Sequence, residues 1–223
     1  AQLAGLYWAK AGHYDIRSAL ITGLALSILF RADSAVLYAL PAIIAMAAKF
    51  MIRVNGKHIF NPANIGIVAC LLLLPQHVWV SPGQWGSALW LAMFLGMCAL
   101  FILQRVPSRD ITAAFLLSYA GIIFGRHMIF GDPWAIPLHK LESGALLIFA
   151  FFMISDPKST PDHKYARMIF AVATAIVACI LQFEFRSREG LFYALAGMSI
   201  LTPLLDRAFR AQTFHWPNIR RQT

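Results

Sequence analysis

Apolar residues occupy most of this chain in long stretches, which are separated by short polar segments. Eight stretches stand out, at roughly 17–31, 34–48, 62–75, 87–104, 110–124, 143–155, 166–183 and 190–205. A helix needs about 20 apolar residues to cross a bilayer, and several of these stretches are shorter. The pattern therefore predicts an all-α polytopic membrane protein with about eight transmembrane helices, some of them broken.

The composition supports a membrane protein and argues against a soluble one. Of the 223 residues, 59% are hydrophobic and only 13% are charged. Soluble domains carry about 25% charged residues, so this chain would have too little polar surface to cover itself. No linker or low-complexity segment divides the sequence. We expect one membrane domain over residues 1–223, with polar cytoplasmic ends at 1–14 and 208–223.

The net charge of +9 is unevenly distributed along the predicted loops. With eight crossings, all but five of the 19 lysines and arginines fall on one side of the membrane. The positive-inside rule places that side, and both termini, in the cytoplasm. The basic charge is therefore a topology signal, with anionic lipids as its expected partners and no nucleic acid. The five exceptions are Arg31, Arg126, Lys140, Arg186 and Arg188.

Motifs of soluble cofactor enzymes and metal sites are missing from the sequence. Cys70, Cys98 and Cys179 stand singly within apolar stretches, and no CxxC pair exists. The sequence contains no GxGxxG, Walker loop or HExxH motif, and its histidines fall at loops or helix ends. We therefore predict no metal site and no catalytic residue of a hydrolase.

Two amides precede the apolar stretch of the segment "HIFNPANIGIVACLLLL" (58–74). If Pro62 is the first helical residue, Asn61 is the N-cap of the helix. Asn64 lies about one turn further in, where an unpaired amide costs a few kcal/mol. The residues alone leave two interpretations open, namely a cap with ordinary packing and a ligand-binding site.

A carboxylate follows an apolar stretch in the segment "FMISDPKSTP" (152–161). Asp-Pro commonly starts a turn, so Asp156 is explained either as a turn residue or as an acceptor for ligand N–H and O–H groups. Lys158 and Ser159 are additional donors for such a ligand. The Asn61-Pro62 and Asp156-Pro157 breaks resemble each other, and paired breaks in two halves of a membrane protein indicate a ligand site between them.

A third polar position lies in "DIRSALITGLAL" (15–26), where Thr22 sits one turn inside the first predicted helix. The simplest explanation of Thr22 is a hydrogen bond to the carbonyl four residues earlier. The topology prediction nevertheless places the openings of all three polar segments on the cytoplasmic side. This convergence favours a shared pocket.

The same segments carry a family resemblance. "SALITGLALSI", "GKHIFNPANIGIV", "FFMISDPKST" and "EGLFYALAGMSILTPLLDR", which span about residues 15–207, are similar to the RnfD/NqrB family. That family comprises the membrane protein RnfD of Rnf electron-transport complexes and its relative NqrB of the sodium-translocating NADH:quinone oxidoreductase. The resemblance implies the bacterial inner membrane, inverted repeats as in urea transporters, and membrane or periplasmic redox subunits as partners. We expect a stand-alone, divergent member that lacks the first two helices of the family.

The resemblance also implies a flavin, riboflavin or FMN, held non-covalently near the cytoplasmic face. A flavin ring edge alternates acceptors with an N–H donor, which amides, hydroxyls and carboxylates can pair. The family attaches a further FMN covalently to a Thr in a Ser-Gly-Ala-Thr-like motif. The corresponding loop reads "VSPGQWGS" (80–87), so we expect no covalent FMN. The expected binding residues are Thr22, Asn61, Asn64 and Asp156, with Lys158 and Ser159 as weaker candidates.

We therefore expect a membrane electron-transfer protein, a redox subunit of an oxidoreductase complex, that passes electrons to or from a partner across the bilayer. Two other functions remain open. One is a small-solute channel or transporter, which the related fold allows, and the other is a flavin-free scaffold subunit of a redox complex. Bound flavin distinguishes the first function from both alternatives.

Overall fold

The computed structural model describes residues 16–81, 97 and 109–212, and these residues are mostly helical. Every predicted apolar stretch contains a helix except 87–104, which lies almost wholly outside the described residues. In chain order the helical elements are α2 (Ile16–Leu29), η1 (Ala35–Tyr38), α3 (Ala39–Met51), α4 (Pro62–Leu73), α6 (Arg109–Phe130), α7 (Ala135–Leu141), α8 (Gly144–Ile148), η2 (Phe149–Met153), α9 (Lys164–Phe183), α10 (Gly190–Ser199) and α11 (Thr202–Ala208).

Two of the described helices, α6 and α9, are long and apolar enough to cross a membrane. The segment from α7 through η2 adds a third span if its two parts, bent by 47°, count as one. The prediction of a mostly helical protein with candidate membrane spans is thus confirmed, whereas broken spans stay a prediction. The number of about eight crossings stays a prediction, because the remaining apolar helices are shorter.

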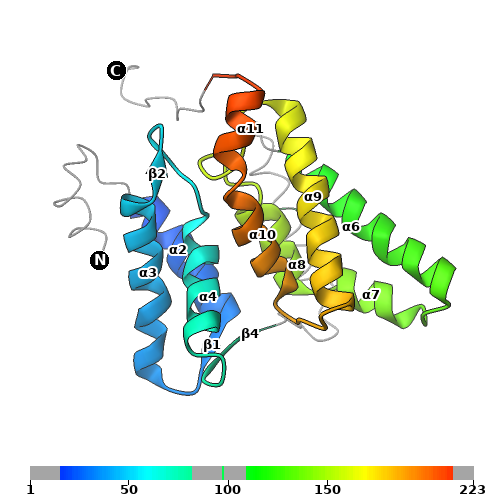
Figure 1. The fold of residues 1–223 in the computed structure, drawn as a ribbon. Helices are drawn as coiled ribbons and strands as arrows, with labels where there is room; N and C mark the ends of the chain where they lie inside the picture. Colours follow the sequence, from blue (N-terminus) through cyan, green and yellow to red (C-terminus); the bar gives the residue numbers. More distant parts are fainter. Residues whose placement is uncertain (1–15, 82–96, 98–108, 213–223) are drawn as a thin grey trace.

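The helices form two groups that lie side by side (Figure 1). The first group consists of α2, α3 and α4, and the second contains α6, α8, α9 and α10. Helix α4 packs against α10 and joins the two groups. The core between them holds fully buried aromatic and aliphatic side chains, whereas side chains such as Leu117 and Ile129 are highly exposed on α6. Such an exterior is suited to lipid rather than water.

Helices α3 and α4 approach each other closely because Gly66 has no side chain. A Cβ atom at Gly66 would lie 2.4 Å from the backbone oxygen of Pro41, which is far inside van der Waals contact. The middle of α4 is tightly packed, with Ile67 fully buried, whereas Leu72 and Leu73 at its C-terminal end are exposed. The position of Asn64 at the start of α4 is therefore fixed by backbone packing.

The described residues are mostly rather than wholly helical, because they also form two short antiparallel strand pairs. One pair is β1 (Phe30–Ala32) with β4 (Val78–Val80). The other is the hairpin of β2 (Arg53–Val54) and β3 (Lys57–His58). Its turn residues, Asn55 and Gly56, have φ angles of +51° and +80°, as a type I′ hairpin turn requires. Strands this short carry no alternating pattern, so the apolar pattern did not predict them.

The transition from α8 to the following turn is irregular. Segment η2 is a π-helical turn, in which the N–H of Ile154 donates to the carbonyl of Phe149 at 2.9 Å. The carbonyl of Ala150 accepts a further hydrogen bond from the hydroxyl of Thr112 on α6, at 2.9 Å. Regular helix resumes only at Lys164. Residues 154–163, here called the Asp156 turn, therefore form an irregular connection at one end of the bundle.

Candidate functional site

Asn61 begins α4 as the sequence predicts. Its Oδ1 accepts from the backbone N–H of Asn64 at 3.1 Å, and Pro62 occupies the first helical position. The N-cap prediction is therefore confirmed. The Asn61 side chain also donates from Nδ2 to the carbonyl of Met153 at 3.3 Å, which links the start of α4 to the end of η2.

Asn64 is almost completely buried, with 1% of its surface exposed. Its Nδ2 donates to the carbonyl of Phe192 on α10 at 3.1 Å. Its Oδ1 is buried and receives no hydrogen bond from any described residue. An unsatisfied acceptor of this kind costs about 1–3 kcal/mol, so it is expected to bind a donor that is not part of the described chain.

Asp156 organises the turn that follows η2. Its Oδ1 accepts from the N–H of Lys158 at 3.0 Å, and its Oδ2 accepts from the hydroxyl of Ser159 at 3.2 Å. The ring Nε2 of His58 lies 3.3 Å from the same Oδ2. Burial alone raises the pKa of Asp156, but the hydrogen bond and charge of His58 and the two local hydrogen bonds hold the pKa below its ordinary value.

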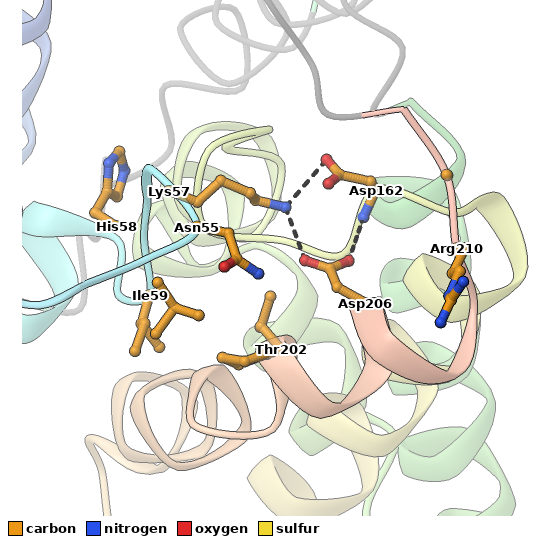
Figure 2. Close-up of a pocket in the computed structure, with 11 residues that line it drawn as sticks. Asn55, Lys57, His58, Ile59, Asp162, Thr202, Asp206 and Arg210 are labelled. Atoms are coloured by element: carbon orange, nitrogen blue, oxygen red, sulfur yellow. Dashed lines mark hydrogen bonds and ion pairs between the residues drawn. The ribbon is translucent and has the colours of Figure 1, made fainter.

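Lys57 is a buried charge, although its place in the sequence predicts only a topology signal. Its Nζ donates to the carbonyl of Thr160 at 2.7 Å and lies 3.0 Å from Asp162 Oδ1 and 3.1 Å from Asp206 Oδ2 (Figure 2). Asp206 also accepts from the N–H of Asp162 at 2.8 Å. All three N–H bonds of the ammonium are thus directed at acceptors from the turn and from α11.

A cavity of about 280 Å³ lies beside this ionic cluster. Its lining includes Asn55, His58, Thr202 and Arg210, and the carboxylates of Asp162 and Asp206. Figure 2 shows these side chains arranged around it, with the Asn55 amide between Lys57 and Thr202. None of the sequence-predicted binding residues lines this cavity. His58 connects the cavity to the predicted cluster, because it lines the former and contacts Asp156 in the latter.

The structure brings together most of the predicted site residues. The two asparagines lie at the start of α4, and three further residues lie in the turn that Asn61 and His58 contact. Thr22 is buried on α2, which packs against α4. The role of these residues in binding stays a prediction. The predicted residues thus lie mainly in two places: Asn61 and Asn64 at the start of α4, and Asp156, Lys158 and Ser159 in the Asp156 turn.

Two contributors, Lys57 and His58, were missed by sequence reasoning. Their partners lie about a hundred or more residues away, so no local pattern reveals them. The signal available was their position directly before the Asn-Pro break, within the segment "GKHIFNPAN". The loop "VSPGQWGS", on which the absence of covalent FMN was predicted, lies almost wholly outside the described residues.

Comparison with known protein families shows to which family the chain belongs. The model of the NQR2, RnfD, RnfE family matches residues 79–215, which is more than half of the sequence. The chain belongs to this family. The RnfD/NqrB resemblance is thereby confirmed, and with it a family of membrane electron-transport proteins. The match covers α6 to α11 and the Asp156 turn, whereas α2 to α4 precede it.

Individual relatives extend the similarity further along the chain. The D subunit of the proton-translocating ferredoxin:NAD(+) oxidoreductase complex of Clostridium ljungdahlii is 26% identical over 85% of this chain and 72% of its own length. The D subunit of the ion-translocating oxidoreductase complex of Pseudomonas aeruginosa is 24% identical over 88% and 74%. Its counterpart in Stutzerimonas stutzeri is 28% identical over 64% of this chain, but only 40% of its own length is covered.

Proposed function

We propose that this chain is a membrane electron-transfer subunit that holds a non-covalent flavin, riboflavin or FMN, near the cytoplasmic face. Family membership and the names of the relatives, which are subunits of ion-translocating oxidoreductase complexes, support a redox role. One structural observation supports the flavin in particular. It is the buried Oδ1 of Asn64, which no described residue satisfies.

The unsatisfied acceptor of Asn64 is compatible with the hydrogen-bonding edge of a flavin ring. The ring carries one N–H flanked by carbonyls, and an N–H is the group that Asn64 Oδ1 lacks. Asn61 has both ends of its amide engaged within the protein. We infer that Asn61 shapes the site and that Asn64 recognises the ring. Thr22, Asp156, Lys158 and Ser159 complete the proposed binding set.

When bound, the flavin supplies the capacity to accept and release electrons, which no side chain of this set has. The residues of the chain contribute binding, orientation and charge. Asp156 is held ionised by His58 and by its own turn, so it places a fixed negative charge beside the proposed site. The buried rings of Phe149 and Phe192, whose centroids are 6.0 Å apart, lie beside the Phe192 carbonyl that accepts from Asn64 and make this region apolar.

The wider setting of the proposal follows from the family and the charge distribution. We propose a multi-pass protein of the bacterial inner membrane, with about eight crossings and cytoplasmic termini. Its partners are other membrane or periplasmic redox subunits, and anionic lipids surround its basic loops. The hairpin, the Asp156 turn and α11 carry basic residues that were predicted to share one side. The structure brings these three segments together at one end of the bundle (Figure 1).

The flavin is tested by extraction. The full chain is purified in detergent, denatured, and the released small molecules are identified by chromatography and absorbance. We expect about one flavin per chain. Replacing Asn64 with Leu keeps the number and branching of side-chain heavy atoms but removes the acceptor, together with the Nδ2 donor to Phe192, and we expect affinity for flavin to fall about tenfold or more. Gln182→Leu, at the opposite end of the bundle, is the matched amide control and is expected to retain the flavin.

Two outcomes would redirect the assignment. A folded wild-type protein that releases no flavin refutes the redox proposal for this site. Solute flux into liposomes containing the protein would then favour the channel, and its absence would favour the scaffold. Retention of flavin by Asn64→Leu at wild-type affinity would refute the assigned role of Asn64.

A further inference from the structure

One short segment, Lys57 to Asn64, contacts a second short segment, Met153 to Asp162, at several points. Asn61 bonds the carbonyl of Met153 at the beginning of the second segment. His58 contacts Asp156 in its middle, at 3.3 Å. Lys57 bonds Thr160 and Asp162 at its end. The Asp156 turn is therefore held along its whole length by consecutive parts of one neighbouring strand and helix start.

Lys57 is the contact with the strongest electrostatic consequence. Its side chain is 9% exposed, and the carboxylates of Asp162 and Asp206 are both within 3.1 Å of its ammonium. Loss of one partner from such a buried pair leaves an uncompensated charge, which is strongly destabilising. Further charges near this cluster include Arg210 on the cavity wall and Arg167, whose Nη1 donates to the carbonyl of Asp162 at 2.6 Å and whose Nη2 pairs with Asp110 at 2.8 Å.

Hydrogen bonds within the turn do not fix its placement relative to α4. The bonds from Lys158 and Ser159 to Asp156 close the turn on itself, and so does the bond from the Thr160 hydroxyl to the Asp156 carbonyl. Such local bonds would travel with the turn if it moved as a unit. The covalent connections to η2 and α9 and the contacts from outside the turn decide where the Asp156 carboxylate lies with respect to Asn64.

We propose that Lys57 is a positioning residue that fixes the Asp156 turn against the start of α4. It acts through the Thr160 carbonyl and Asp162, while Asp206 secures the ammonium to α11. This inference rests on the proposed function in one respect, because the site that Lys57 positions is the flavin site. The β2–β3 hairpin turn at Asn55 and Gly56 places Lys57 between the Asp156 turn and α11 (Figure 2).

The test compares Lys57→Met and Lys57→Arg with Arg126→Met in the full chain. Arg126 is a matched control, because it forms an ion pair with Asp132 at the opposite end of the bundle. Hydrogen–deuterium exchange is followed for peptides that cover residues 155–163, and flavin affinity and the flavin absorbance spectrum are measured in parallel. Exchange needs no flavin, so the two proposals can fail separately.

We expect Lys57→Met to speed amide exchange in residues 155–163 about tenfold or more, with little change in α9. Flavin affinity should fall about tenfold, and the absorbance bands of any retained flavin should shift. Lys57→Arg should recover part of both losses, because a guanidinium can still bridge the two carboxylates. Arg126→Met should change neither quantity.

Unchanged exchange in residues 155–163 of a folded Lys57→Met protein would overturn the inference. Faster exchange with unaltered flavin affinity and spectrum would also overturn it, because the lysine would then be a structural anchor only. If Lys57→Met does not fold, Lys57→Met combined with Asp162→Asn and Asp206→Asn removes the stranded charges and gives the same two readouts. A wild-type protein without flavin refutes the proposed function, and exchange then decides the positioning of the turn alone.

Discussion

The two ends of the helical bundle use ion-paired cations in different ways. At the hairpin end, Lys57 joins a carbonyl and two carboxylates that lie about a hundred or more residues away in the sequence. At the opposite end, Arg126 pairs at 2.9 Å with Asp132, which is six residues away. Its guanidinium also lies over the rings of Phe130 and Phe183, at 4.9 and 4.5 Å.

The difference shows that a buried ion pair can join segments far apart in the sequence, as Lys57 does, whereas a partly exposed one can pair near neighbours, as Arg126 and Asp132 do. The Lys57 side chain is 9% exposed, whereas that of Arg126 is 29% exposed. Water and lipid head groups can replace the partners of a partly exposed arginine, but not those of a buried lysine. The hairpin end should therefore be sensitive to single charge changes, and the opposite end should be tolerant of them.

The largest contrast is expected between Asp206→Ala and Asp132→Ala. Removing Asp206 takes away one of the two carboxylates around Lys57 and the acceptor of the Asp162 N–H, and should lower the free energy of unfolding by about 1.5–3 kcal/mol. Removing Asp132 should cost less than about 1 kcal/mol. Titration with a denaturing detergent in mixed micelles measures both. Equal losses would show that burial does not separate the two ends.

Backbone packing gives a second contrast between constrained and open positions. Gly66→Ala places a methyl group 2.4 Å from the Pro41 oxygen and should cost about 1–3 kcal/mol. Gly121→Ala on α6 meets nothing within 4 Å and should be neutral or slightly stabilising, since Ala is the better helix former. The same unfolding titration compares the two. A neutral Gly66→Ala would mean that α3 and α4 separate easily.

Removing a helix-capping side chain should cost more stability at the hairpin end of the bundle than at the opposite end. Asn61→Ala removes a side-chain cap and the bond to Met153, and should cost about 1–2 kcal/mol. Ser34 precedes η1 near the opposite end without a side-chain cap hydrogen bond, so Ser34→Ala should change the unfolding free energy by less than about 0.5 kcal/mol. Similar losses for both variants would argue against the capping role of Asn61.

The smallest expected effect is the acid dependence due to Asp156. Its pKa in the folded protein lies below the ordinary value of 3.8, so its stabilising contribution is fully present above that pH and is lost as pH falls through the lower folded value. Asp156→Asn should therefore flatten the loss of unfolding free energy between about pH 5 and pH 3. A variant that keeps the wild-type acid profile would assign the loss to other carboxyl groups.

Much of the helical framework follows from sequence, because apolar stretches and breaks are local features. The Asn61 cap and the break before Asp156 were predicted from residue type and spacing alone. The pairing of Lys57 with Asp206 was not, since it joins residues 149 positions apart. Periodicity also gave no indication of the two-residue strands or of helix α7, which lies in a segment rich in Pro and polar residues.

The candidate site illustrates the same limit in one pair of amides. The sequence predicted that capping explains Asn61 and leaves Asn64 unexplained. The structure satisfies both ends of Asn61, but only the Nδ2 of Asn64. Which atom stays unsatisfied depends on the distance from α4 to α10. That distance is set by the packing of whole helices and is not encoded in any single motif.

The π-helical turn of η2 has one residue more than an α-helical turn. Each residue of a helix advances the chain by roughly 100° around the axis. The segment after Met153 is therefore rotated by about that angle relative to its direction after a regular α-helical turn. Deleting any one codon between Phe149 and Met153 would restore regular winding and swing the Asp156 carboxylate toward another side of the bundle. The count of residues in this stretch, more than their identities, decides which neighbours the carboxylate meets.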